Sequence, residues 1–260
     1  MRPRLFYVIV PVISAILLVP ALHLIAGDSS SSKIDESISV RIELPSPCGG
    51  IRNISVDSRR RYLVAATSDK SVKLYDASSM KYIRTLGIPT GPEYEGIINS
   101  AVISPDGSII ACGGWTGYNK STKFSVYIFD RSSGKMIRRI TGQPETINTL
   151  QFSPNGEYLA IGSKSSDGIR LYGTSDWTFV ASEADYADRC SDISFAQSGR
   201  FATVSADGNV RLYSNQGILL KKTMLRSNNP YKVSITDDGS MIAVIYVDMC
   251  NIDVYSGGSL

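Results

Sequence analysis

Apolar and polar positions along the chain follow one short pattern that recurs five times. Each copy has an apolar strand, a polar turn, a strand of small apolar residues and a strand that ends in an aromatic residue. The copies are 54, 43, 41 and 42 residues apart. A unit this small cannot bury its own apolar faces, so the repeat predicts that the copies pack on one another. Their aromatic ends are Val72–Tyr75, Val126–Phe129, Ile169–Tyr172, Val210–Tyr213 and Ile252–Tyr255.

Each copy divides into four expected strands, which we call a to d in chain order. The small apolar b strands are typical of central strands that are covered on both faces. The pattern predicts an all-β chain of five four-stranded antiparallel sheets, with repeats at about 51–86, 98–140, 147–181, 190–222 and 230–256. The expected a strands are Ile51–Val56, Ser100–Ser104, Asn148–Ser153, Asp192–Phe195 and Tyr231–Ile235, and the expected d strands are Tyr82–Leu86, Met136–Ile140, Trp177–Ala181 and Ile218–Lys222.

The turn after strand a carries glycine at one recurring position: Gly107, Gly156, Gly199 and Gly239. A recurrent glycine indicates a backbone with positive φ. Arg60 takes this place in the first repeat, so we expect that turn to be strained or differently shaped.

The N-terminal segment, residues 1–27, is typical of an export signal. Arg2 and Arg4 precede an apolar run from Leu5 to Ala26. The run is close to the roughly 20 residues that span a bilayer, so a cleaved signal peptide and a retained membrane anchor both remain open. We expect an exported protein, periplasmic or otherwise extracytoplasmic, whose only membrane contact is a tether through residues 5–26.

Residues 28–37 are polar and serine-rich, which predicts a flexible linker before a domain at 38–260. Residues Ile38–Leu44 alternate between apolar and polar, which predicts a half-buried strand. Of the four cysteines, Cys112 lies in an apolar strand and is expected to be a buried thiol. The disulfide state of Cys48, Cys190 and Cys250 is left open.

The charge is almost balanced, because removing Arg2 and Arg4 leaves 25 basic against 24 acidic residues. This balance gives no electrostatic reason to expect nucleic acid as a partner. His23, in the leader, is the only histidine. Catalytic triads and histidine metal sites are therefore excluded for the domain. Paired acids such as Glu93 and Glu95 are expected to be solvated, so we predict no enzyme activity, no cofactor and no metal.

The turn Ser104–Gly107 and the segment Ser205–Tyr213, within four-stranded units of about 42 residues, resemble the WD40 repeats of β-propellers. The resemblance covers residues 38–260. It implies a radial arrangement of sheets, or blades, with the a strands innermost and the d strands outermost.

The chain departs from this family at two motifs. The Trp-Asp pair is replaced by endings such as Tyr75-Asp76 and Tyr213-Ser214, and no Gly-His pair opens a repeat. We therefore expect the family's hydrogen-bond relay to be missing. The repeats resemble the degenerate ones of exported and multidomain bacterial proteins, some of which carry a caspase-like protease domain elsewhere. Five copies are fewer than the seven usual blades. Two alternatives remain open: a closed five-bladed ring, in which Ile38–Leu44 supplies the missing d strand, and a part of a larger ring.

Long connections point to a binding face. The d-to-a and b-to-c connections of antiparallel blades emerge on the same side, so the segments Gly87–Gly96, Gly113–Lys123 and Ser182–Arg189 are expected to gather there. Exposed aromatic residues with arginine are typical of protein-binding hot spots. An alternative is that Trp115 folds back onto its own insertion. The predicted partner-binding residues are Tyr94, Trp115, Tyr118, Tyr186 and Arg189.

The leading hypothesis is a non-enzymatic docking platform for another protein. The alternatives are a propeller that senses a small molecule or peptide in a central channel, and a regulatory domain of a larger enzyme such as a caspase-like protease. A fold alone does not decide among them.

Overall fold

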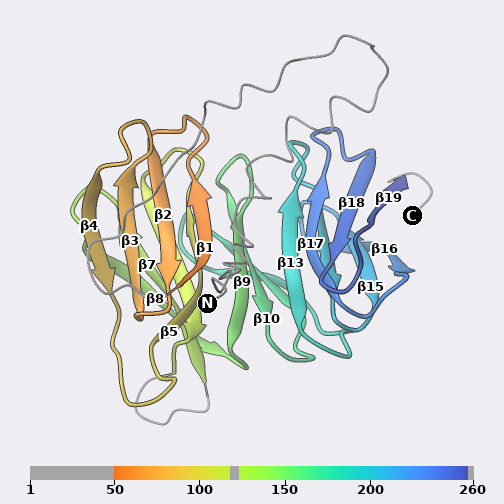
Figure 1. The fold of residues 1–260 in the computed structure, drawn as a ribbon, viewed down its shortest axis with the longest axis horizontal. Helices are drawn as coiled ribbons and strands as arrows, with labels where there is room; N and C mark the ends of the chain where they lie inside the picture. Colours follow the sequence, from red (N-terminus) through yellow and green to blue (C-terminus); the bar gives the residue numbers. More distant parts are fainter. Residues whose placement is uncertain (1–49, 118–122, 257–260) are drawn as a thin grey trace, which may run out of the picture. The chain divides into compact units, whose positions relative to one another are not determined.

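The computed structural model describes residues 50–117 and 123–256, which form five antiparallel sheets in chain order (Figure 1). The predicted all-β class is confirmed. Four sheets have four strands and the fifth has three. Within these ranges, no helix is long and apolar enough to cross a membrane. The predicted leader, linker and strand Ile38–Leu44 lie outside the described residues.

The strand boundaries follow the predicted repeats closely. The first sheet contains β1 (Ile51–Val56), β2 (Tyr62–Thr67), β3 (Ser71–Asp76) and β4 (Tyr82–Gly87). The second contains β5 (Ile97–Ile103), β6 (Ile109–Trp115), β7 (Phe124–Asp130) and β8 (Met136–Gln143). The third contains β9 (Ile147–Phe152), β10 (Tyr158–Ser163), β11 (Ile169–Gly173) and β12 (Phe179–Glu183). The fourth contains β13 (Cys190–Phe195), β14 (Phe201–Ser205), β15 (Asn209–Tyr213) and β16 (Leu219–Met224), and the fifth contains β17 (Pro230–Ile235), β18 (Met241–Tyr246) and β19 (Ile252–Ser256).

One outer strand begins later than predicted. Trp177 does not belong to β12, because its φ of 63° places it in the preceding turn. Its side chain packs against the buried cluster between the second and third sheets.

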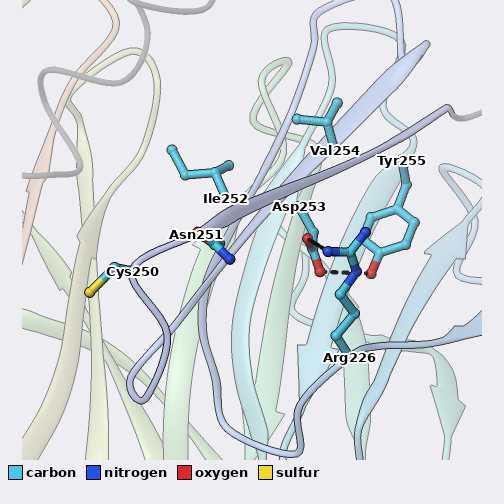
Figure 2. A pocket seen from close by; sticks show the side chains of 7 residues that line it. All are labelled: Arg226, Cys250, Asn251, Ile252, Asp253, Val254 and Tyr255. Carbon is cyan, nitrogen blue, oxygen red and sulfur yellow. Dashed lines mark hydrogen bonds and ion pairs between the residues drawn. The ribbon is translucent and has the colours of Figure 1, made fainter.

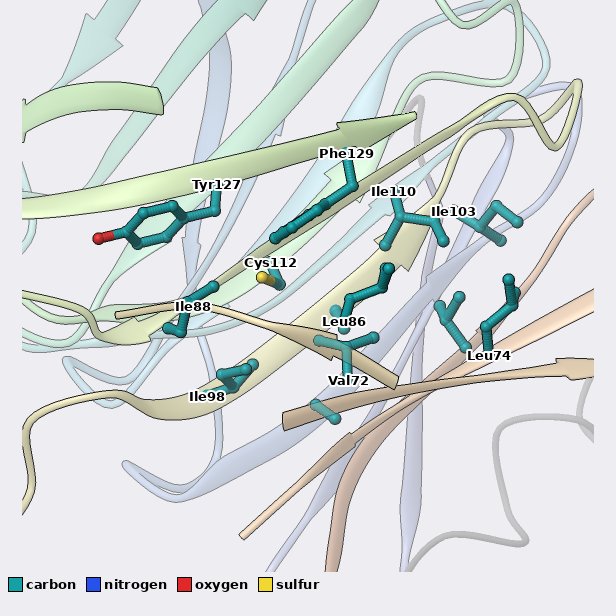
Figure 3. Close-up of a cluster of buried hydrophobic side chains, with 13 residues drawn as sticks. Val72, Leu74, Leu86, Ile88, Ile98, Ile103, Ile110, Cys112, Tyr127 and Phe129 are labelled. Atoms are coloured by element: carbon teal, nitrogen blue, oxygen red, sulfur yellow. The ribbon is translucent and has the colours of Figure 1, made fainter. Parts of the chain in front are cut away.

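The core is divided among the gaps between neighbouring sheets. Val72 and Leu74 of β3 share one buried cluster with Ile110 and Cys112 of β6, and Figure 3 shows these side chains meeting between the first and second sheets. Three further clusters join the second sheet to the third, the third to the fourth and the fourth to the fifth. Each sheet is therefore stabilised mainly by its neighbours, as the repeat predicted.

The interfaces do not close into a ring within the described residues. The innermost strands β1, β5, β9, β13 and β17 contact one another in chain order, without a comparable contact from β17 back to β1 in the described ranges. No buried cluster of described residues joins the fifth sheet to the first. These five blades are thus held by four interfaces, and a closed five-bladed ring is not what the described contacts show.

Side chains on the innermost strands also tie the first sheet to the second, the second to the third and the fourth to the fifth. One position on the strand supplies an oxygen that accepts a hydrogen bond from a backbone amide of the following innermost strand. Because this amide lies at the edge of its sheet, it has no strand partner there, and the side chain satisfies it. The bonds run to Asn53 Oδ1 from the amide of Ala101 (3.0 Å), to Ser100 Oγ from Leu150 (3.1 Å) and to Asp192 Oδ2 from Val233 (3.1 Å).

The turn between strands a and b is strained in the first sheet, as expected. Gly107, Gly156, Gly199 and Gly239 have φ between 74° and 82°, and Arg60 has φ 55° at the equivalent place. A side chain in this left-handed region costs about 1 kcal/mol or more. The turn nevertheless forms, because Asp57 accepts bonds from the backbone amides of Arg61 (2.6 Å) and Tyr62 (2.8 Å).

We expect Arg60→Gly to raise the free energy of unfolding by up to about 1 kcal/mol, since it relieves the left-handed strain. The greater freedom of glycine in the unfolded chain offsets part of the gain. Urea unfolding monitored by circular dichroism measures the change. The matched control is Gly156→Ala, at φ 75°, which should lower stability. A loss of stability in Arg60→Gly would contradict the assigned strain.

Candidate functional site

Two of the predicted binding residues form an exposed aromatic pair. The rings of Tyr94 and Trp115 lie 5.9 Å apart between centroids, with exposed fractions of 63% and 41%. Trp115 also meets the buried ring of Phe124 edge-on at 5.6 Å. The alternative that Trp115 only folds back onto its own insertion is thus half correct: one side of the indole packs and the other stays open. We call Tyr94 and Trp115 the aromatic pair.

The loop that carries Tyr94 is anchored at several points. The backbone amide of Gly96 donates to the carbonyl of Trp115 (2.8 Å), and Ile97 pairs with Trp115 across β5 and β6. Lys70, in the first sheet, donates from Nζ to the carbonyl of Gly91 (2.8 Å). The loop that precedes β5 and the end of β6 therefore lie side by side, as the order of the connections predicted.

Tyr186 does not belong to this surface, and the prediction that it binds a partner is corrected. Its side chain is only 4% exposed and packs in the cluster between the third and fourth sheets, with Leu171 and Ile193. The loop between β12 and β13 turns its aromatic residue into this gap. Tyr94 and Trp115 belong to the second sheet and its preceding loop, so the five predicted residues do not form one site.

Arg189, a further predicted residue, adds little to the pair. Arg189 is half-buried, and its carbonyl accepts a bond from the amide of Ala206 (3.0 Å), which ties its loop to the turn before β15. Tyr118 lies outside the described residues.

Tyr186 instead belongs to a buried polar network, which is built from other residues than the family's Gly-His and Trp-Asp motifs. Its hydroxyl lies 2.6 Å from that of Thr203 on β14 and 2.9 Å from that of Tyr213 on β15. The guanidinium of Arg211, which is fully buried, stacks 3.9 Å above the ring of Tyr186. Arg211 also donates to Asp207 at 2.6 Å. A tyrosine and an arginine thus connect the b-to-c turn, two strands and the incoming loop.

The pKa values of the ionisable groups in this network depend on burial and on the partners that each group binds. Burial alone would raise the pKa of Asp207, but hydrogen bonds from Arg211 and Asn209 outweigh it and hold the pKa below its usual value. Burial lowers the pKa of Arg211, and the bond to Asp207 more than restores it. Burial also raises the pKa of Tyr186 well above its usual value. The tyrosine therefore stays neutral, and the buried charge of Arg211 is balanced by one carboxylate.

A hollow lies along the edge of β19 that does not pair with β18. It has a volume of about 580 Å³ and is lined by Arg226 and residues 250–255. Figure 2 shows Ile252 and Val254 on one side of β19 and Asp253 on the other, facing Arg226 at 3.6 Å. The fourth strand that the other sheets have is not present among the described residues of this sheet.

No group of three or more His, Cys, Asp or Glu residues within the described ranges could hold a metal ion. Asp185, an acid of the loop before β13, pairs with Lys222 at 2.7 Å. The three described cysteines are free thiols, and burial raises the pKa of Cys112 to about 12, which suits a core residue.

Comparisons with known proteins agree with the fold. The profile described as "WD domain, G-beta repeat" matches residues 39–76, 134–172 and 177–214. Similar proteins include the eukaryotic translation initiation factor 3 subunit I of Culex quinquefasciatus, at 29% identity over 51% of this chain and 41% of that protein. The small ribosomal subunit protein RACK1 of Caenorhabditis elegans is 30% identical over 47% of this chain and 33% of that protein.

Antiparallel four-stranded blades packed in chain order define the class of the protein as a β-propeller. The repeat matches narrow the class further: three segments of the chain match the WD40 repeat, and together with the similar proteins they support a WD40-repeat β-propeller. It spans less than half the length of the two relatives named above. Those relatives are eukaryotic, and the more specific likeness to exported bacterial repeats stays a prediction.

The network around Tyr186 predicts that this residue stabilises the fold. Tyr186→Phe should lower the free energy of unfolding by about 1 to 3 kcal/mol, because buried hydroxyls lose their partner. Tyr186→Ala should cost about 3 to 5 kcal/mol, since it also leaves a cavity. Urea unfolding measures both, with Tyr94→Ala as the exposed control. Equal stability of Tyr186→Phe and the unmodified protein would show that the hydroxyl bonds contribute nothing.

The paired Asp207 predicts sensitivity to acid. Its pKa is lowered in the folded state, so its contribution to stability is present above the unfolded value of about 3.9 and is lost as pH falls below it. Urea midpoints measured from pH 6 to pH 2.5 should fall more steeply in the unmodified protein than in Asp207→Asn, whose starting stability is lower. Asp237→Asn, at an exposed acid, is the control and should keep the steep slope.

Proposed function

We propose that this chain is a non-enzymatic docking platform for another protein, and that the aromatic pair is the centre of the docking surface. The observation that carries the proposal is the position of Tyr94 and Trp115, two large rings in contact with each other and still 63% and 41% exposed. Large aromatic side chains supply most of the binding free energy at many protein interfaces.

The contacts that hold Tyr94 and Trp115 in place support a binding site that is formed before a partner binds. The bonds from Gly96 to Trp115 and from Lys70 to Gly91 fix the loop against two sheets. Packing against Phe124 holds the indole in one orientation. Binding to such a surface costs little ordering entropy, and this favours a folded partner of complementary shape.

The relatives are consistent with this proposal at a coarse level. The printed name of one is a subunit of a translation initiation factor, and that of another is a protein of the small ribosomal subunit. Both names describe components of larger assemblies. For this chain we propose the shared character, a propeller that binds proteins, without the particular assemblies. We further propose that it acts outside the cytoplasm, which rests on the sequence of residues 1–27.

The test is affinity capture with the full chain as bait and an extracytoplasmic extract of the source organism. Trp115→Ala with Tyr94→Ala should leave thermal unfolding within a few degrees of the unmodified protein and remove the captured partner. Phe179→Ala removes an aromatic ring of similar exposure (54%) from an outer strand and should leave capture unchanged. Equal capture by the double variant would contradict the assigned surface. Loss of the captured partner in Phe179→Ala would indicate that the binding site lies on the outer strands instead.

A further inference from the structure

The opposite face of the blades, where the a-to-b turns emerge, carries a hollow that the proposed docking surface does not use. It has a volume of about 180 Å³ and spans the first four sheets. Its apolar lining includes the buried side chains of Val102 and Phe152 and the half-buried Phe195. Ser58, Gln151 and Gln197 add hydroxyl and amide groups at its border. We call this hollow the turn groove.

Three consecutive arginines, Arg59, Arg60 and Arg61, follow Ser58 in the first turn, where the other four turns carry a glycine. Arg61 pairs with the buried Asp57 at 3.1 Å and donates to the carbonyl of Asp106. Arg59 and Arg60 are exposed, and neither forms an ion pair with a described residue. The turn that lines the groove through Ser58 thus also carries two exposed arginines without an ion pair to a described residue.

This turn is rigid in spite of its strain. Both the amide and the hydroxyl of Ser58 donate to the carbonyl of Pro105, at 3.0 Å and 2.6 Å. Arg131 of the second sheet stacks 4.1 Å from the centre of the Tyr62 ring and donates to the carbonyl of Gly107. Asp106, whose carbonyl accepts a bond from Arg61, has its carboxylate bound by Ser104 and Ser108. A left-handed arginine that is held this firmly is a backbone outlier of the kind that clusters at binding sites.

We propose that the turn groove is a second interaction surface, which binds an acidic peptide segment of a partner protein. One apolar side chain of the segment enters between Phe152 and Phe195, and flanking carboxylates meet Arg59 and Arg60. Charge complementarity selects the segment, because the exposed Arg59 and Arg60 directly follow Ser58, which lines the hollow together with Phe152 and Phe195. This surface is distinct from the aromatic pair, which lies at the end of the blades where the d-to-a and b-to-c connections emerge.

Fluorescence anisotropy with the full chain and a labelled peptide of sequence EEFLEE tests the proposal. We expect saturable binding that weakens as salt is added, since the charges are exposed. Charge reversal by Arg59→Glu with Arg60→Glu should weaken binding at least tenfold. Arg138→Glu, the same change at an exposed position of β8, is the matched control and should leave affinity within twofold of the unmodified protein.

Two further measurements separate binding from folding and from other ligands. Arg60→Gly should bind EEFLEE several-fold more weakly although it is expected to be the more stable protein, so a loss of fold cannot explain that result. The peptide EESSEE should bind at least fivefold more weakly than EEFLEE. Equal binding of the two peptides, equal binding by the charge-reversed variant, or tighter binding of a labelled oligothymidine would each overturn the proposal. The variants at Arg59 and Arg60 should leave partner capture through the aromatic pair unchanged. The two proposed binding surfaces can therefore be tested independently.

Discussion

The burial of sheet faces against neighbouring sheets is the constraint on which the rest of this structure depends. A four-stranded sheet of this size exposes two apolar faces, and each fully buried Val, Leu or Ile contributes about 1.5 to 3 kcal/mol relative to an exposed one. Val72 and Leu74 gain this only because Ile110 and Cys112 cover them. The innermost strands add directional bonds, through acceptors such as Ser100 and Asp192. Stability therefore depends on neighbours, and a blade taken alone would lose most of it.

The fourth blade shows how a repeat can lose its family motif and keep a polar tie. No histidine is available in residues 24–260, yet the hydroxyl of Tyr186 reaches both Thr203 and Tyr213. A buried arginine is costly unless it is paired, and Asp207 supplies the pair for Arg211. The blade in which Tyr213-Ser214 replaces the family's Trp-Asp pair thus still has buried polar bonds, although the Nε of Arg211 has no hydrogen-bond partner among the described residues.

The rigid stack presents two different chemistries at its two ends. One end offers the aromatic pair on a loop fixed by Gly96 and Lys70. The other offers an apolar groove beside the exposed charges of Arg59 and Arg60. Because the strands between them are buried and hydrogen-bonded, neither end needs to rearrange for the other to bind. Under the two proposals made above, a propeller with such ends would hold two partners at once, which is a physical basis for a scaffold.

The sequence by itself determined the strands, their order and the turns, because these follow from local periodicity. Ile51–Val56 was predicted to the residue, and the unusual Arg60 marked the strained turn. Connectivity alone also brought Tyr94 to Trp115, since alternate connections of an antiparallel sheet share one side. Only the tertiary structure decided that Tyr186 is buried, that Arg211 pairs with Asp207 inside the core, and that the described blades meet at four interfaces. Periodicity records which face of a strand is apolar, whereas the filling of a gap between sheets depends on side chains from distant segments, such as Tyr186 and Thr203, that meet only when the blades pack.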